Sequence, residues 1–153
     1  MKFALNGALT IGTWDGANIE MAEAMAVENM FVFGLRADSV TRVKAVGYDP
    51  KLYAEENVQL RNVIDAIATG AFSPGDPDRY RALTQGLLLR DPYLLLADFT
   101  DYVEKQCQVD ALFGDPLLWA QRALRSIAGM GPFSVDRTIR EYVQRVWTAP
   151  PRD

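Results

Sequence analysis

The amino-acid sequence predicts an α/β fold, with one strand–helix–strand unit followed by a mostly helical remainder. Three observations support this class. Two short apolar runs of strand-like composition lie near the start of the chain, a segment of high helix propensity separates them, and apolar residues recur at helical spacing through most of the remaining residues. We expect residues 1–35 to form the βαβ segment and residues 36–153 the helical portion of a single partial domain that spans 1–153.

The two expected strands are residues 8–12 and 30–34. Neither run alternates polar with apolar residues, which is typical of strands covered on both faces. Residues 17–25 form the expected helix between them, and a strand–helix–strand order predicts a parallel pair with a right-handed crossover. The apolar side of this helix consists of Ile19, Ala22 and Met25. Because two parallel strands alone do not make a stable sheet, we expect further strands from a neighbouring segment that is missing from this sequence.

The clearest amphipathic pattern of the helical portion is at residues 60–67. Leu60, Val63, Ile64 and Ile67 follow the i, i+3, i+4, i+7 rule of a helix with one apolar side. Gly70 comes next, at the place where a glycine ends a helix.

Two Asp-Pro pairs predict further helix starts, with the aspartate as the N-cap and the proline at the first helical position. Asp76-Pro77 is expected to open a helix that ends near Arg90, and Asp115-Pro116 one that ends near Ala128.

Two more capping residues are expected. Asp98 is predicted to cap a helix that runs through Phe113 and ends at Gly114. Ser134 is predicted to cap the last helix, which Pro150-Pro151 would stop. The inward stripe of that helix is expected to comprise Ile139, Tyr142, Val143 and Val146.

Charge and composition exclude several classes of function. The net charge of −4 leaves no basic excess to neutralise nucleic-acid phosphates or an anionic membrane, so we expect neither partner. Arg36, Arg42 and Lys44 are interleaved with Asp38 and indicate a solvated helix face. The chain has no histidine, which removes histidine acid–base catalysis and nearly every zinc site, and we expect no metal site.

Cys107 is the only cysteine, so an intrachain disulfide is impossible and a reducing compartment is expected. Its place in a helical pattern between Tyr102 and Leu112 favours a half-buried, unreactive thiol over a nucleophile. The sequence has no stretch of about 20 apolar residues to span a bilayer. These features predict a cytoplasmic location.

The most specific motif lies at the start of the chain, where Met1-Lys2 is followed by Leu5, Asn6 and Gly7. This pattern resembles the second half of the pyridoxal-phosphate attachment signature of the glycogen (α-glucan) phosphorylases, in which Glu-Ala-Ser-Gly-Thr-Gly-Asn leads into Met-Lys-x-x-Leu-Asn-Gly. Phrases similar to those that come after the phosphorylase lysine continue in the same order along essentially the whole chain. They are Gly-Ala-Leu-Thr-Ile-Gly-Thr, Asp-Gly-Ala-Asn-Ile-Glu-Met, Phe-Val-Phe-Gly, Phe-Ser-Pro and Ser-Val-Asp-Arg-Thr-Ile.

The resemblance implies that the chain is the last portion of the Rossmann-like C-terminal domain of a GT-B glycosyltransferase. Lys2 would bind pyridoxal 5′-phosphate in the complete enzyme. The cofactor phosphate would act beside inorganic phosphate, which takes a terminal α-1,4-linked glucosyl unit from the glucan to give glucose 1-phosphate. Because the family's groups for sugar and phosphate lie upstream of Met1, we expect no catalytic residue in this chain and no activity of the chain alone.

A second interpretation of Lys2 in the isolated chain is a solvated N-terminal lysine, because the family's phosphate-binding segment does not precede it. The two interpretations are compatible. A different class of function is a non-enzymatic truncated product or a helical interaction module that pairs through an uncovered sheet edge. As a phosphorylase part the chain would have the missing N-terminal portion as its partner, and as an interaction module it would pair with other chains, including a second copy.

Two other pairs of residues are better explained by structure than by chemistry. Gly12 and Gly16 lack the spacing of a dinucleotide-binding loop, so they predict a turn between strand and helix. Glu20 and Glu23 lie on one helical flank without a cleft between them, which favours a solvated face over the carboxylate pair of a glycosidase.

The three tryptophans could stack on sugar rings. Trp119 and Trp147 lie on apolar helix stripes, so we expect them in the core or at a docking surface. For Trp14 a ligand contact stays open as an alternative to a structural role.

Overall fold

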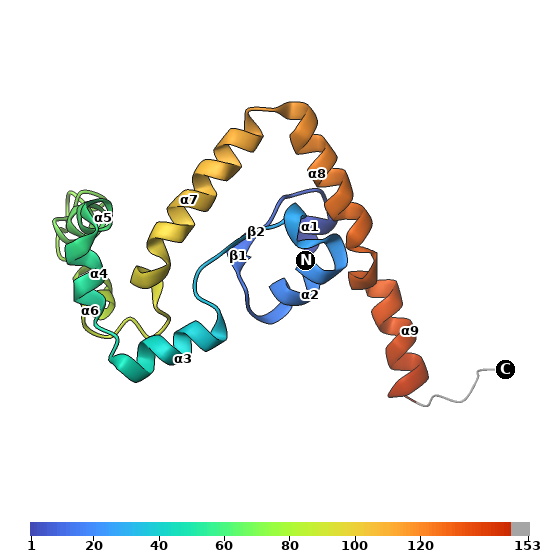
Figure 1. Ribbon diagram of the computed structural model, residues 1–153, viewed down its shortest axis with the longest axis horizontal. Coiled ribbons are helices and arrows are strands. Elements are labelled where there is room, and N and C mark those ends of the chain that lie inside the picture. The colour runs from blue at the N-terminus through green and yellow to red at the C-terminus, as the bar shows by residue number, and fades with distance from the viewer. Residues whose placement is uncertain (148–153) are drawn as a thin grey trace. The chain divides into compact units, whose positions relative to one another are not determined.

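The computed structural model describes residues 1–147 (Figure 1). The chain divides into two compact units. Unit 1 contains Met1–Val32 and the chain from Lys105 onward, and unit 2 contains Phe33–Glu104. The single domain with a division at residue 35 stays a prediction. The mostly helical α/β class is confirmed, since short helices fill most of the chain after the two strands.

Unit 1 contains both strands, except for the last residue of the second. Its elements are α1 (Lys2–Leu5), β1 (Ile11–Thr13), α2 (Gly16–Met25), the 3-10 turn η1 (Val27–Asn29), β2 (Phe31–Phe33), the second half of α7 (Leu95–Phe113), α8 (Pro116–Gly129), the 3-10 turn η2 (Gly131–Phe133) and α9 (Val135–Arg145).

The strands are parallel neighbours, and the N–H of Phe31 donates to the carbonyl of Thr10 at 2.9 Å. The predicted βαβ order is confirmed, with shorter strands. Ala8 is not in β1 because its N–H caps α1, donating to Phe3 at 3.0 Å.

The core of unit 1 is built largely from methionine. Its buried members are Ala4, Met21, Ala22, Met25, Met30 and Met130, which we call the methionine cluster. Methionine has three rotatable bonds, so it fills irregular gaps between short elements. The predicted apolar side of α2 is confirmed by the burial of Ala22 and Met25.

The end of α8 packs against the end of α2 at Gly129. A Cβ built on Gly129 would lie 2.4 Å from the Cα of Met25 and 2.7 Å from the carbonyl oxygen of Ala24. Both neighbours are backbone atoms, which cannot rotate away. Glycine is therefore required for the two helices to approach this closely.

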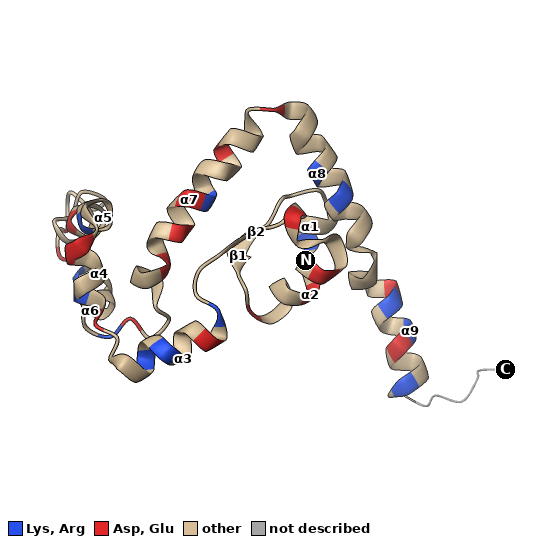
Figure 2. Cartoon of the chain, viewed as in Figure 1, with Lys and Arg blue, Asp and Glu red and all other residues tan. Residues whose placement is uncertain are grey.

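Unit 2 is helical. Its elements are α3 (Ala37–Val46), α4 (Pro50–Glu56), α5 (Val58–Ala68), α6 (Arg81–Leu89) and the first half of α7. Its core cluster consists of the buried residues Ala54, Leu60, Ile64 and Leu96, and Leu94 is buried as well. The predicted solvated face of α3 is confirmed at Arg42 and Asp38, which pair at 3.0 Å and are both exposed. Figure 2 shows residues of both charges along α3.

Helix α5 agrees with its predicted pattern. Leu60 and Ile64 are buried, and Gly70 comes after the helix with φ +78°, a conformation that favours glycine. Asn57 caps the helix by accepting a hydrogen bond from the N–H of Leu60 at 3.0 Å. Val63 is 43% exposed, so the buried stripe is narrower than the sequence pattern suggests.

The prediction that a helix starts at Asp76-Pro77 is wrong. Helix α6 starts at Arg81, and consecutive turns occupy residues 71–80. The N–H of Asp76 donates to the carbonyl of Ser73 at 2.9 Å, so Asp76 is part of one of these turns. The loop also packs on Gly70, where a Cβ would lie 2.6 Å from the Cα of Pro77.

The predicted cap of α7 is also wrong. The helix starts at Leu95, so Asp98 lies inside its first turn. The capping carboxylate is that of Asp91, which accepts from the N–H of Leu95 at 3.0 Å and of Leu96 at 2.9 Å. The end of the helix at Phe113 is as predicted.

The last two helices have their predicted starts. Asp115 accepts from the N–H groups of Leu117 and Leu118 at 3.1 and 3.0 Å, and Ser134 accepts from that of Arg137 at 3.4 Å. The predicted stop at Pro150-Pro151 lies outside the described residues. No helix within residues 1–147 is both long and apolar enough to cross a bilayer.

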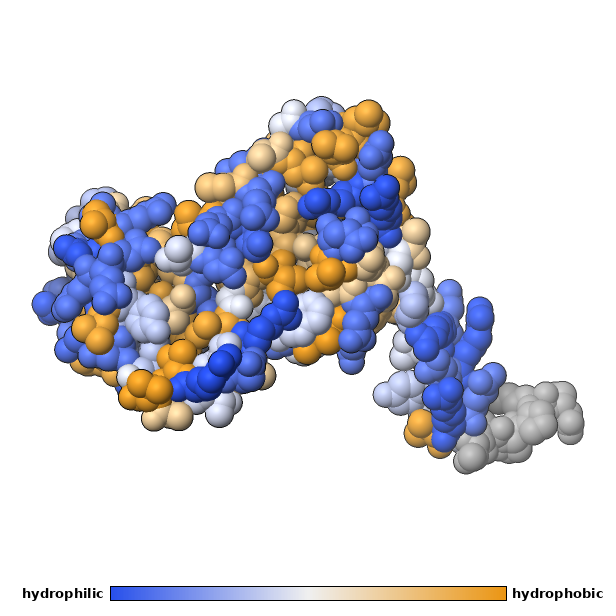
Figure 3. Space-filling model, in the orientation of Figure 1, coloured by the Kyte–Doolittle hydropathy of each residue, from blue (hydrophilic) through white to orange (hydrophobic). Residues whose placement is uncertain are grey.

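The residues predicted to form the inward stripe of α9 are not buried, so this prediction is wrong. Ile139, Tyr142, Val143 and Val146 are between 44% and 61% exposed. The face of α9 seen in Figure 3 is mostly hydrophilic, and charges of both signs follow one another along the helix in Figure 2. Arg137 and Glu141 form an ion pair at 2.8 Å. The helix is thus amphipathic, but its apolar stripe is not covered by the part of the chain that the structure describes.

Candidate cofactor-attachment site

Lys2 is the first residue of α1, and its side chain is exposed. Within residues 1–147, no ion pair or hydrogen bond engages its amine. The exposure agrees with the solvated-lysine interpretation of the isolated chain. Its role as the cofactor lysine stays a prediction.

Helix α1 ends in a tight glycine cap. Gly7 has φ +86°, its N–H donates to the carbonyl of Ala4 at 3.1 Å, and the N–H of Ala8 donates to that of Phe3 at 3.0 Å. This pair of bonds is the Schellman arrangement, which satisfies the last carbonyls of a helix. The cap gives a defined end to a helix of only four residues.

The side chain of Asn6 adds one bond to this turn. Its amide donates to the backbone carbonyl of Lys2 at 2.8 Å. The N–H of Asn6, which would reach that carbonyl in a continuing α-helix, donates instead to Phe3 at 3.0 Å. The side chain therefore replaces the backbone as the donor to Lys2.

Helix α1 is attached to the rest of unit 1 through two small residues. Ala4 is 1% exposed and belongs to the methionine cluster. A Cβ on Gly7 would lie 3.3 Å from Cδ1 of Ile127, so α8 lies against the cap. The turn that carries Lys2 is thus supported by residues more than a hundred positions away in sequence.

The chain turns from strand to helix at Trp14 and Asp15, whereas Gly12 lies within β1 and Gly16 starts α2. The amide of Asn18 donates to the carbonyl of Thr13 at 2.9 Å, and the hydroxyl of Thr13 donates to the carboxylate of Asp15 at 2.9 Å. A Cβ on Gly12 would lie 2.7 Å from the Asn18 amide, so this glycine leaves room for a side chain of the chain itself. The interpretation of a turn rather than a phosphate-binding loop is supported.

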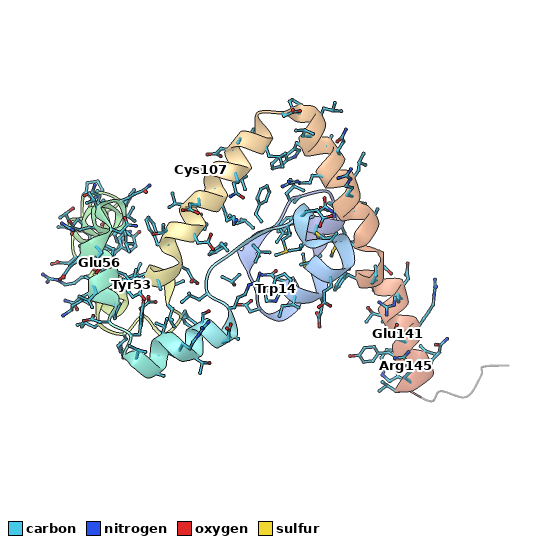
Figure 4. The ribbon with its side chains drawn as sticks, viewed as in Figure 1. Trp14, Tyr53, Glu56, Cys107, Glu141 and Arg145 are labelled. Carbon is cyan, nitrogen blue, oxygen red and sulfur yellow. The ribbon has the colours of Figure 1, made fainter. Side chains whose placement is uncertain are left out.

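The remaining candidates have structural surroundings. Glu20 and Glu23 are exposed on α2, as expected for a solvated face. Trp14 is half-buried and packs against the methionine cluster (Figure 4), which favours the structural role over a sugar contact. Residues 1–147 contain no group of three or more histidine, cysteine, aspartate or glutamate side chains that could hold a metal ion.

The other two tryptophans and the cysteine lie near the surface. Trp119 is half-buried with its ring 5.1 Å from that of Phe113, and Trp147 is 54% exposed with its ring 5.7 Å from that of Tyr142. Trp147 is therefore not in the core, and its place at a docking surface stays a prediction. The prediction of a half-buried Cys107 is also wrong, because the thiol is exposed on α7 (Figure 4).

Two carboxylates of unit 2 bind the backbone directly after β2. Asp101 accepts from the N–H of Gly34 at 2.7 Å, and Asp98 accepts from that of Leu35 at 2.8 Å. Burial raises the pKa of the Asp98 carboxyl, the Leu35 N–H acts in the opposite direction, and the charges of Asp101 and Asp91 raise the pKa further. No local pattern in the sequence indicates these bonds, because the partners are more than sixty residues apart.

Asp91 is the most buried charged residue of unit 2, at 1% exposed. Besides capping α7 it accepts a hydrogen bond of 2.6 Å from the hydroxyl of Tyr48. Burial, followed by this bond and the charge of Asp91, raises the pKa of Tyr48, so the phenol keeps its proton and remains a donor. These carboxylates are structural groups of unit 2.

Comparison with known proteins identifies the family. Residues 1–149 match the profile of the family described as "Carbohydrate phosphorylase". The chain belongs to the carbohydrate phosphorylases. This family comprises glycosyltransferases that use pyridoxal phosphate.

Individual phosphorylases are similar over essentially the whole chain. The glycogen phosphorylase of Synechocystis sp. is 49% identical over 151 residues, which cover 99% of this chain and 18% of that protein. The human liver glycogen phosphorylase is 46% identical and the rat brain form 44% identical, each over 153 residues that cover all of this chain and 18% of the relative. The chain thus spans 18% of the length of these relatives.

Proposed function

We propose that residues 1–153 are part of an α-glucan phosphorylase. The enzyme transfers a terminal α-1,4-linked glucosyl unit to inorganic phosphate and releases glucose 1-phosphate. The observation that carries this proposal is the identity of 44–49% to glycogen phosphorylases over 99–100% of the chain. A cytoplasmic location and the C-terminal domain of a GT-B fold belong to the same proposal.

Within that enzyme, Lys2 is the residue that binds pyridoxal 5′-phosphate. A primary amine bonds covalently to an aldehyde only when it is deprotonated, which requires desolvation or a nearby cation. In this chain the amine of Lys2 is exposed and unpaired, so an aldehyde can reach it, but the amine is not desolvated. The groups that bury the amine and bind the cofactor phosphate come from the phosphorylase polypeptide outside residues 1–153.

The cofactor supplies a phosphate that acts beside the substrate phosphate. The contribution of this chain is to carry the lysine and to hold its position through α1, the methionine cluster and α8. The groups that contact the sugar and inorganic phosphate belong to the rest of the polypeptide. The chain by itself is therefore inactive, and we place no catalytic residue in it.

The proposal is tested by placing residues 1–153 in a full-length phosphorylase polypeptide. The protein is loaded with pyridoxal 5′-phosphate, reduced with borohydride, digested and analysed by peptide mass spectrometry. We expect one modified peptide, which contains Lys2, and phosphate-dependent release of glucose 1-phosphate from maltodextrin. Modification at another lysine, or glucose 1-phosphate release by residues 1–153 alone, would contradict the proposal.

A further inference from the structure

We infer that Asn6 is a positioning residue for Lys2, holding the backbone from which the cofactor-binding amine projects. The inference rests on the proposed role of Lys2 and extends it to a residue with no reactive group. Its basis is the 2.8 Å hydrogen bond from the Asn6 amide to the Lys2 carbonyl.

The bond matters because α1 is too short to fix its own first residue. Four residues form a single turn, and a turn of this length is marginal without tertiary support. The backbone of Lys2 lies at the open end of that turn. The Asn6 side chain donates to the Lys2 carbonyl at this end, and Asn6 itself precedes the glycine cap at the other end. One hydrogen bond therefore joins the two ends of the turn.

The support continues from the cap into the core. Gly7 comes directly after Asn6 and lies against Ile127 of α8, while Ala4 is buried in the methionine cluster. Both contacts hold the later part of the turn. Asn6 connects Lys2 to this fixed part of the turn, because its side chain donates to the carbonyl of Lys2.

Unit 1 contains a matched control for this bond. The amide of Asn29 donates to the carbonyl of Met25 at 2.6 Å, with the same sequence separation of four residues. Asn29 is 4% exposed and ends the segment after α2, so its bond is structural. Removing it should lower the stability of unit 1 while the hydrogen bond to the Lys2 carbonyl stays in place.

The experiment compares Asn6→Ala, Asn6→Asp and Asn29→Ala in the full-length phosphorylase polypeptide that carries residues 1–153. Asn6 has φ −103°, a conformation that alanine and aspartate adopt without strain, so both variants should fold. Aspartate keeps the shape of asparagine and removes the donor. The probe is pyridoxal 5′-phosphate, followed by its absorbance and by borohydride trapping at Lys2, with thermal unfolding measured in parallel.

We expect both Asn6 variants to bond to the cofactor more slowly, by about five-fold, the factor that corresponds to one neutral hydrogen bond. Asn29→Ala should lower the unfolding temperature and leave the rate within about two-fold, a change too small for the loss of a hydrogen bond to Lys2.

A wild-type rate of cofactor bonding in both Asn6 variants would overturn the inference, as would an equal slowing by Asn29→Ala. The proposed function fails separately. If the unaltered protein does not trap the cofactor at Lys2, the role of Lys2 itself is wrong, whatever the Asn6 variants do.

Discussion

The hydroxyl of Tyr48 donates a 2.6 Å hydrogen bond to the carboxylate of Asp91, one of the most buried side chains of unit 2. The same carboxylate accepts from the N–H groups of Leu95 and Leu96. A single buried aspartate thus joins the segment between α3 and α4 to the start of α7. Buried charges are tolerated when they are hydrogen-bonded in this way.

Tyr48→Phe should destabilise unit 2, because it removes one of three donors to a buried carboxylate. A hydrogen bond to a charged group contributes about 1.5–3 kcal/mol, and we expect a loss in the free energy of unfolding of that size. Urea unfolding followed by circular dichroism measures it. Tyr93→Phe is the control, since Tyr93 is 80% exposed, and it should change the free energy by less than about 0.5 kcal/mol. Equal effects of the two substitutions would show that the bond to Asp91 does not stabilise the fold.

Asp98→Asn should stabilise unit 2 at neutral pH. The pKa of Asp98 is raised in the folded chain, so its stabilising contribution is fully present below its unfolded pKa of about 3.9 and is lost as pH rises through the folded pKa. Asparagine keeps an oxygen that accepts from the N–H of Leu35 and carries no charge. We expect a gain of less than about 1 kcal/mol at pH 7, because solvent screens this half-buried group. The gain should disappear near pH 3, and a gain that is equal at both pH values would contradict the assignment.

Gly129→Ala should destabilise unit 1 by about 1–3 kcal/mol, the usual cost of overpacking. The new Cβ would meet the backbone of Met25 at 2.4 Å, and α8 would have to move away from α2. Gly86→Ala is the contrasting substitution, because a Cβ there meets nothing within 4 Å in the middle of α6. Alanine is the better helix former by about 0.8–1 kcal/mol, so Gly86→Ala should raise the unfolding temperature where Gly129→Ala lowers it. Thermal unfolding of the two variants would show the opposite signs, and a shared sign would be evidence against the close approach.

Two Asp-Pro pairs show which helix starts can be predicted from sequence. Asp115-Pro116 starts α8 as predicted, because a cap and the first turn after it are local. Asp76-Pro77 has the same chemistry but starts no helix, since Ser73 and Gly70 hold it in turns. The capping chemistry is thus a signal that neighbouring turns can override.

Other errors have a non-local cause. Aspartate suits a helix start, which makes Asp98 a reasonable cap for α7, but its carboxylate binds Leu35, more than sixty residues away. The apolar stripe of α9 is present as a pattern, but periodicity does not reveal whether the covering surface lies in the same chain. At the candidate site, the motif identifies Lys2 and the Asn6-Gly7 pair. The hydrogen bond between Asn6 and Lys2 requires the geometry of the turn.

Substitution of Lys2 is the most direct test of the proposed chemistry. In a full-length phosphorylase polypeptide that carries residues 1–153, Lys2→Ala should abolish borohydride-reducible attachment of pyridoxal 5′-phosphate and nearly all glucose 1-phosphate release. Lys2→Arg should fail as well, because a guanidinium keeps its proton and cannot bond to the aldehyde. Lys44→Ala and Lys51→Ala are the matched controls, since both lysines are exposed in unit 2.

We expect both control variants to retain cofactor and activity, and Glu20→Gln and Glu23→Gln to stay within a few-fold of the unaltered protein, because these carboxylates lie on the exposed face of α2. Cofactor content by absorbance and glucose 1-phosphate release from maltodextrin are measured on the same preparations. Retained attachment in Lys2→Ala together with its loss in Lys44→Ala or Lys51→Ala would move the cofactor to unit 2. That outcome would refute both the assignment of Lys2 and the positioning role of Asn6, since the turn from Met1 to Ala8 would then have no part in holding the cofactor.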